Sequence, residues 1–295
     1  MKRHQKSISS DEEDLRQSKE LKPNDDDRNE TIVIKSTFND LCIDILYELF
    51  EYLNANQLYE TFYDLTSNVK SIIQNYSLPL HVDISTEKAF RTFSAYIQPT
   101  FDHYPKQFIS LSLSSYIIDM TPFLSITTLI LSQMYLKETQ IILKKLIHLT
   151  NLKIIHPKKH SNGLIEAVLH VQTLKTFIYD WFFYELKSIQ LKLPSQIQYL
   201  IISSSFTSLN LLLPCLPNLR YLNIHFCFSV GECCAPSMLL LRKLIVKTDD
   251  DISIQKVICF LKSISNLEYL LTSGSLCIQD AVESIKILNS LQNVN

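Results

Sequence analysis

The feature that most constrains the fold of this chain is a short apolar hexamer, L-x-x-L-x-L, that recurs at a near-constant spacing. The eight copies are FISLSL (108–113), ITTLIL (126–131), LTNLKI (149–154), LKTFIY (174–179), IQYLII (197–202), LRYLNI (219–224), LRKLIV (241–246) and LEYLLT (267–272). Their second apolar positions are residues 111, 129, 152, 177, 200, 222, 244 and 270, so the steps are 18, 23, 25, 23, 22, 22 and 26 residues. A single hexamer means little in a chain that is 46% hydrophobic, but eight copies in phase indicate a repeat.

Repeats of about 20 to 29 residues built on such a strand are typical of leucine-rich repeats. Each hexamer predicts a strand with its aliphatic side chains turned inward, and the segments 138–149 and 253–264 have the spacing of covering helices. Cys227 occupies the Asn/Cys position that follows such a strand, but the other copies do not keep this residue. We therefore expect an α/β fold over 108–295, an irregular solenoid with a parallel concave sheet.

The third and fifth positions of each hexamer are predicted to point outward, onto the concave face of the sheet. Small and polar residues fill these positions in the first copies, and tyrosines and aliphatic residues dominate in the later ones. Aromatic side chains in a concavity often carry binding energy. The candidate substrate-binding residues are Tyr199, Tyr221, Asn223, Lys243 and Tyr269, with Tyr199 and Tyr221 as neighbours. The alternative is that the tyrosines only reflect the strand propensity of a partly covered sheet.

A second pattern precedes the repeats, in the segment LCIDILYELFEYL (41–53). Its apolar residues Ile45, Leu46, Leu49, Phe50 and Leu53 would form one stripe of a helix. A polar break at 54–56 follows, and then a second apolar-periodic run over 58–73, whose helix Asn54 or Asn56 can cap. These segments predict a compact helical unit over 37–75.

The remaining segments divide the chain further. Residues 1–30 hold seven Lys/Arg and nine Asp/Glu, which leaves too little apolar surface to offset about 1–2 kcal/mol per residue of backbone ordering entropy. We therefore expect a disordered polar tail over 1–36. Residues 76–107 fit neither pattern and are assigned to a linker or first cap.

Composition excludes several classes of function. With only three glycines, far apart, neither G-x-G-x-x-G nor G-x-x-x-x-G-K-[ST] can be written, which excludes the glycine-dependent phosphate loops. A net charge of −2 gives no sign of a nucleic-acid partner, and no uncharged run is uniformly apolar enough to predict a membrane span. The first residues contain no apolar segment of a signal peptide, so we expect a cytoplasmic or nuclear protein.

Seven scattered cysteines do not form the pattern of a secreted disulfide framework, and we expect reduced thiols. His225, Cys227, Cys233 and Cys234 invite a zinc hypothesis, but no second pair at metal-ligand spacing follows them. No nucleophile elbow, H-E-x-x-H or kinase signature is present. We predict no catalytic residues, no metal and no cofactor.

An apolar helix pair with an acidic residue near its start, placed before leucine-rich repeats, resembles the F-box family. That family's first helix reads roughly L-P-x-E-I-L-x-x-I-F-x-Y-L. The matching residues are Leu41, Cys42, Asp44, Ile45, Leu46, Leu49, Phe50, Tyr52 and Leu53. Cys42 and Asp44 stand where the family has proline and glutamate.

The resemblance implies a non-enzymatic adaptor of a ubiquitin ligase. Its F-box would dock on a Skp-type adaptor, and through it on a cullin, while the repeats hold a protein substrate. The implied adaptor-binding residues are Leu41, Cys42, Ile45, Leu49 and Leu53. The competing reading is a repeat scaffold outside any ligase, whose N-terminal helices merely cover the exposed first repeat of the solenoid.

Overall fold

The computed structural model describes residues 41–74, 78–100, 107–115, 118–158, 162–183, 193–204, 206–226, 238–248, 260–261, 264 and 266–274. The polar tail over 1–36, Cys227 and most of the helix expected over 253–264 lie outside these residues. The described residues from Cys42 onward belong to one compact unit.

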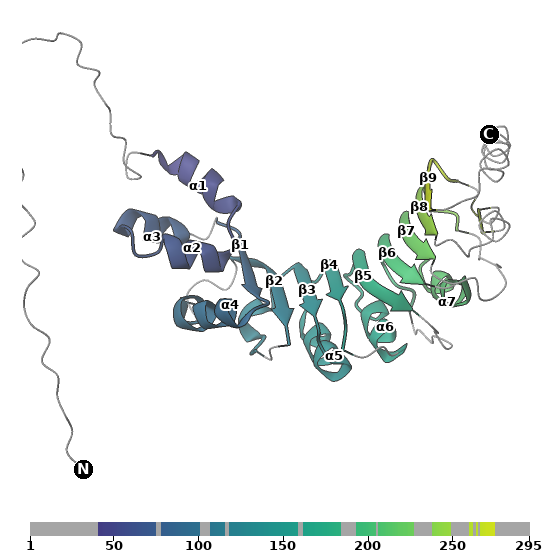
Figure 1. Ribbon diagram of the computed structural model, residues 1–295, viewed down its shortest axis with the longest axis horizontal. Helices are drawn as coiled ribbons and strands as arrows, with labels where there is room; N and C mark the ends of the chain where they lie inside the picture. Colours follow the sequence, from purple (N-terminus) through teal and green to yellow (C-terminus); the bar gives the residue numbers. More distant parts are fainter. Residues whose placement is uncertain are drawn as a thin grey trace, which may run out of the picture. The chain divides into compact units, whose positions relative to one another are not determined.

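Nine strands form one parallel sheet, and their order in space follows their order in the chain (Figure 1). The strands are β1 (Leu80–Ile84), β2 (Phe108–Ser114), β3 (Thr128–Ser132), β4 (Asn151–Ile155), β5 (Thr176–Phe183), β6 (Tyr199–Ser204), β7 (Tyr221–Phe226), β8 (Lys243–Thr248) and β9 (Tyr269–Gly274). Strands β2 to β9 each begin inside one of the eight hexamers. The expected α/β fold with a parallel sheet is therefore confirmed.

The hexamers pair with one another in register. At the second apolar position Leu129 lies opposite Leu152, which lies opposite Phe177, and the same match continues to β9. The side chain at this position is buried in every strand from β2 (Leu111) to β8 (Leu244). The residues directly before and after it in each strand are half-buried or exposed. Because side chains alternate between the two faces of a strand, this burial identifies one face as the core.

A backbone ladder fixes where each strand begins. The carbonyl of Thr127 accepts two hydrogen bonds, both of 2.9 Å, from the N–H groups of Thr150 and Asn151 in the following repeat. The same doubled acceptor recurs at Thr150, Lys175, Gln198, Arg220 and Arg242. Six consecutive steps therefore hold successive repeats in one register through main-chain atoms alone.

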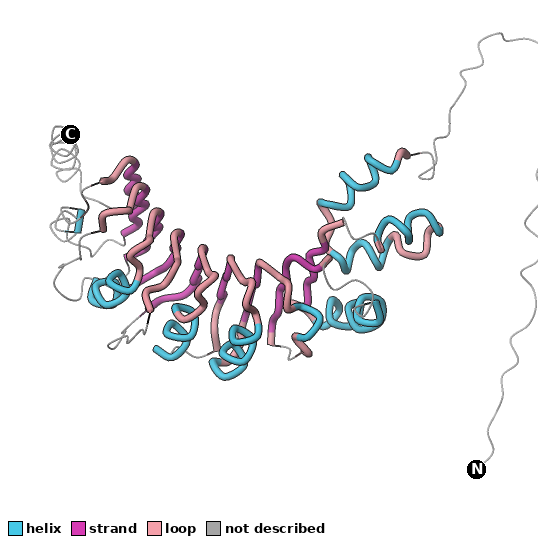
Figure 2. The backbone as a smooth tube through the Cα atoms, turned by 180° about the vertical axis from the view of Figure 1, so that it is seen from behind, coloured by secondary structure: helices cyan, strands magenta, loops and turns pink. Residues whose placement is uncertain are grey.

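The described helices that connect the strands from β3 to β7 lie on one face of the sheet. Helices α5 (Leu136–Lys145), α6 (Asn162–Leu169) and α7 (Phe206–Leu212) follow β3, β4 and β6 in the chain. Short 3₁₀ turns, η4 (Thr121–Phe123) and η5 (Leu213–Cys215), complete the connections that are described. In Figure 2 these helices lie on the outer side of the curved sheet and the strands line its inner side, which we call the concave face.

The range 76–107, assigned to a linker or first cap, contributes the first strand of the sheet. It contains β1, α4 (Glu87–Thr92), the π-helix η2 (Phe93–Ile97) and the 3₁₀ turn η3 (Gln98–Thr100). Strand β1 pairs in parallel with β2 and forms one edge of the sheet. Its segment, LHVDI, alternates buried and more exposed residues, with Val82 and Ile84 in register with the second and third apolar positions of the next hexamer. Pro79 stands at the first position, so the repeat pattern missed this strand.

Three short helices precede the sheet: α1 (Ile43–Glu51), α2 (Ala55–Thr61) and α3 (Ser67–Ile73). Of the two predicted caps, Asn54 starts α2, where its side chain accepts from the N–H of Gln57 and the Gln57 side chain accepts from the N–H of Asn54. Thr66 caps α3 by accepting from the N–H of Val69. Such caps satisfy N–H groups that have no partner within the helix.

Candidate functional site

The apolar stripe of helix α1 has two edges that run along the helix, one buried in the core and one exposed to solvent. Leu46 and Phe50 are buried, and the Phe50 ring packs on Phe62 with ring centroids 5.3 Å apart. Ile45 and Leu49, beside them on the same stripe, are 44% and 46% exposed. One edge of the helix therefore packs on the chain and the other presents aliphatic side chains to solvent.

The exposed edge continues at both ends of the helix. At about 3.6 residues per turn, Cys42, Ile45, Leu49, Tyr52 and Leu53 share one side, which we call the α1 face. Cys42 is exposed, Leu53 is half-buried, and Tyr52 is 82% exposed. Leu41, also half-buried, directly precedes this face. Tyr52 was not among the predicted adaptor-binding residues, although it occupies the tyrosine position of the F-box pattern.

The start of α1 has the backbone conformation that a proline would adopt. Cys42 is the N-cap with φ −67° and ψ 154°, and its side chain makes no capping hydrogen bond. Proline fixes φ near about −65°. At this departure from the F-box pattern, the backbone thus has the φ that a proline would fix.

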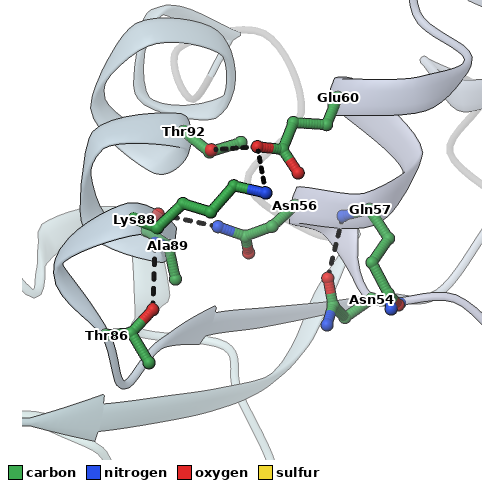
Figure 3. Close-up of polar contacts among 8 residues, drawn as sticks. All are labelled: Asn54, Asn56, Gln57, Glu60, Thr86, Lys88, Ala89 and Thr92. Carbon is green, nitrogen blue, oxygen red and sulfur yellow. Dashed lines mark hydrogen bonds and ion pairs between the residues drawn. The ribbon is translucent and has the colours of Figure 1, made fainter.

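A polar clamp joins α2 to α4 (Figure 3) and to strand β1 at the edge of the sheet. The Asn56 amide donates to the carbonyl of Ala89 in α4 at 2.8 Å, and its oxygen accepts from the N–H of Asp83 in β1 at 3.1 Å. Asn56 itself is 6% exposed. A single side chain therefore satisfies a donor of the edge strand and an acceptor of the neighbouring helix.

Glu60, one turn further along α2, extends this clamp. Its carboxylate accepts from the Lys88 ammonium at 3.2 Å and from the Thr92 hydroxyl at 3.1 Å, both in α4 (Figure 3). These two donors, Lys88 first, hold the pKa of the Glu60 carboxyl below its ordinary value. The helices next to β1 are thus anchored by polar contacts, while the α1 face lies outside them.

The second surface is the concave side of β6 to β9, which we call the tyrosine face. Its members are the residues at three in-register positions of these strands: Tyr199, Ile201, Ser203, Tyr221, Asn223, His225, Lys243, Ile245, Lys247, Tyr269, Leu271 and Ser273. Tyr199 and Tyr221 pair in register with ring centroids 5.9 Å apart, which confirms that they are neighbours.

All five predicted substrate-binding residues lie on this face. Tyr199 and Tyr269 are 47% and 48% exposed, Lys243 is exposed, and Tyr221 and Asn223 are half-buried. Tyr221, Lys243 and Tyr269 stand in one row across three adjacent strands.

His225 and Lys247 also belong to the tyrosine face and were not predicted as site residues. They pair in register on β7 and β8, and each lies two residues after the last outward position of its own hexamer. The strands run longer than the hexamers, so continuing the alternation by one step would have found both residues.

An apolar pocket of about 580 Å³ lies apart from both surfaces, between α5 and α6. Leu143, Leu146, Ile147 and Val171 supply its apolar lining, and Glu166 and His170 contribute polar groups. Because α5 and α6 belong to consecutive repeats, this pocket marks the seam between two repeats on the outer side of the sheet.

Metal-binding chemistry finds no support in the part of the chain that the structure describes, where no three His, Cys, Asp or Glu side chains gather as ligands. Of the residues considered for zinc, His225 lies on the tyrosine face, while Cys227, Cys233 and Cys234 fall outside the described residues. No helix within the described ranges is both long and apolar enough to span a membrane.

Comparison with known proteins gives no family assignment. No protein-family model matches the sequence, and no curated protein matches it either. The α1 face and the tyrosine face are therefore the features of this chain that bear on its function.

Proposed function

We propose that this protein is a substrate-recognition subunit of a Skp–cullin–F-box ubiquitin ligase. In this proposal α1 to α3 form an F-box that docks on a Skp-type adaptor, which links it to a cullin. The sheet and its helices form a leucine-rich-repeat horseshoe that holds a protein substrate on the tyrosine face. The protein itself is not an enzyme, because ubiquitin transfer is performed by other subunits.

The observation that carries the proposal is the exposure of the α1 face. Ile45, Leu49 and Tyr52 expose about half or more of their surface on a helix whose other edge is packed. Contiguous apolar surface of this kind marks interaction sites. A standard protein interface buries about 800 Å² on each partner, which is feasible if the neighbouring helices add to the contact. The F-box resemblance assigns the same face to the Skp-type adaptor.

A second candidate is a repeat scaffold outside any ligase, and the Asn56 clamp favours it. An edge strand must have its free donors satisfied or covered, and Asn56 does this for Asp83 of β1. Helices α2 and α4 therefore serve as a cap under either proposal. The two proposals differ in α1, because covering β1 does not require Ile45 or Leu49 to face solvent.

The test is direct binding between the full chain and a purified Skp-type adaptor, measured by calorimetry. We expect sub-micromolar affinity for the wild type. Leu49→Asp places a charge on the α1 face and should weaken binding about a hundredfold, because it removes an apolar contact and buries an unpaired carboxylate.

Ile43→Asp is the matched control. Ile43 is 54% exposed on the same helix but lies beyond the buried pair Leu46 and Phe50, away from the α1 face. We expect it to bind the adaptor like the wild type. Absence of binding by the wild-type chain, with Leu49→Asp less stable than wild type, would support the scaffold instead.

A further inference from the structure

The concave face changes its charge between its two halves. On β1 to β5 the concave positions carry both signs, with Asp83, Lys153 and Asp180 among them. On the tyrosine face the twelve positions include Lys243 and Lys247 but no carboxylate. The chain as a whole has a net charge of −2, so this positive surface runs against the overall charge.

The two lysines are placed symmetrically about an apolar residue. Both are exposed on β8, on either side of the half-buried Ile245. Neither forms an ion pair with any residue that the structure describes. Glu268, which precedes β9, is paired with Arg242 instead. Among the described residues, no carboxylate therefore competes with an external partner for either ammonium group.

The spacing of these side chains matches that of an extended peptide. Alternate residues of a strand stand about 6.6 Å apart on the same side, so Lys243, Ile245 and Lys247 form a row with that spacing. A bound segment in extended conformation presents its first, third and fifth side chains at the same interval. Tyr221 and Tyr269, in register with Lys243 on either side, offer aromatic surface next to the charge.

We propose that the tyrosine face binds an extended acidic segment of the protein substrate, with two carboxylates flanking an apolar side chain in the pattern acidic–x–apolar–x–acidic. The carboxylates pair with Lys243 and Lys247, and the apolar side chain packs on Ile245. This inference rests on the proposed function, because it takes the tyrosine face as the substrate-binding surface and names the chemistry of the substrate.

A peptide fits this surface better than a nucleic acid. The middle row of the tyrosine face is Ile201, Asn223, Ile245 and Leu271, which is mainly aliphatic. Nucleic-acid affinity depends on many contacts between cations and phosphates, and two lysines about an aliphatic row supply few. A carboxylate pair about an apolar residue uses all three side chains.

The test is a selection of random twelve-residue peptides, displayed on phage, against the purified full chain without any adaptor. We expect the wild type to enrich peptides with Asp or Glu two positions on either side of an apolar residue. The double variant Lys243→Glu/Lys247→Glu should reverse the preference, toward Lys and Arg at those positions.

Affinity of one enriched peptide, synthesised with a fluorescent label, gives the magnitude. Lys243→Gln and Lys247→Gln should each weaken binding about fivefold, as expected for exposed ion pairs, and added salt should weaken wild-type binding. Lys153→Gln, on the concave face of β4 outside the tyrosine face, is the matched control and should leave the affinity unchanged.

The inference is overturned if the selection enriches nothing, if the enriched peptides are neutral or basic, or if charge reversal leaves the preference unchanged. Binding of a labelled single-stranded oligonucleotide that is lost in the same double variant, with no acidic peptide enriched, would assign the face to nucleic acid instead. Because no adaptor is present, failure here leaves the Leu49→Asp test of the α1 face independent.

Discussion

At the scale of single residues, Cys42 shows how a departure from a sequence pattern can leave a structure unchanged. The F-box pattern has proline there, and the loss of proline's fixed φ would be expected to weaken the helix start. The backbone of Cys42 nevertheless has φ −67°, within the range of proline. Cysteine at this position therefore affects how readily the unfolded chain adopts this conformation, rather than the conformation itself.

Proline in place of Cys42 should stabilise the helix. We expect Cys42→Pro to raise the free energy of unfolding by about 0.4–1 kcal/mol, because it removes conformational freedom from the unfolded chain only. Urea unfolding followed by circular dichroism measures this. Cys42→Ala is the control, since it removes the thiol without fixing φ. A lower stability for the proline variant would show that the N–H of Cys42 or the conformation of Leu41 is needed.

The outward positions of the tyrosine face could be predicted residue by residue, because alternation along a strand depends only on local geometry. Tyr199, Tyr221 and Lys243 were found in this way. His225 and Lys247 were missed, because the repeat pattern gives where a strand begins and not how far it extends. The exposure of Leu49 could not be predicted from periodicity, since an apolar residue on an amphipathic helix gives the same pattern whether it packs on its own chain or on a partner. Only the F-box resemblance implied that Leu49 faces outward.

At the scale of elements, the junction between α2, α4 and β1 depends on one buried amide. Asn56 was predicted only as a possible helix cap, and its actual partners, Asp83 and Ala89, are 27 and 33 residues away in the chain. Local pattern carries no information about such pairings. The same holds for β1 itself, whose place at the edge of the sheet is fixed by its pairing with β2 rather than by any repeat.

Removing this amide should loosen the junction. We expect Asn56→Ala to lower the free energy of unfolding by about 1–3 kcal/mol, because it leaves the N–H of Asp83 and the carbonyl of Ala89 without their partner. Chemical denaturation gives the value. As a control, Gln57→Ala on the exposed side of α2 should cost less, because it removes a surface contact of the capping box. Equal losses in both variants would contradict the role given to Asn56.

At the scale of the whole sheet, the strand order was predictable because a fixed period and stacking of neighbours leave few alternatives. Stability along such a sheet need not be uniform. Strand β9 has mostly exposed residues, whereas β4 and β7 alternate between buried and half-buried ones. Strand β1, the other edge, has mostly buried or half-buried residues and is held by the Asn56 clamp.

We therefore expect opening to begin at β9. In hydrogen–deuterium exchange followed by mass spectrometry, peptides covering 269–274 should exchange faster than those covering 151–155 and 221–226, because local opening costs less where little apolar surface is buried. Peptides covering 80–84 should be the better protected of the two edges. Equal protection of 80–84 and 269–274 would contradict this order.

The doubled carbonyl acceptors from Thr127 to Arg242 have a consequence for how this surface can evolve. They set the pitch and alignment of the side-chain rows through main-chain atoms, which every amino acid except proline can supply in full. Outward residues such as Tyr199, Tyr221 and Lys243 can then be replaced without changing the register or spacing of the strands. The architecture does not depend on which side chains stand at the outward positions, so new binding preferences can arise by single substitutions while the fold stays the same.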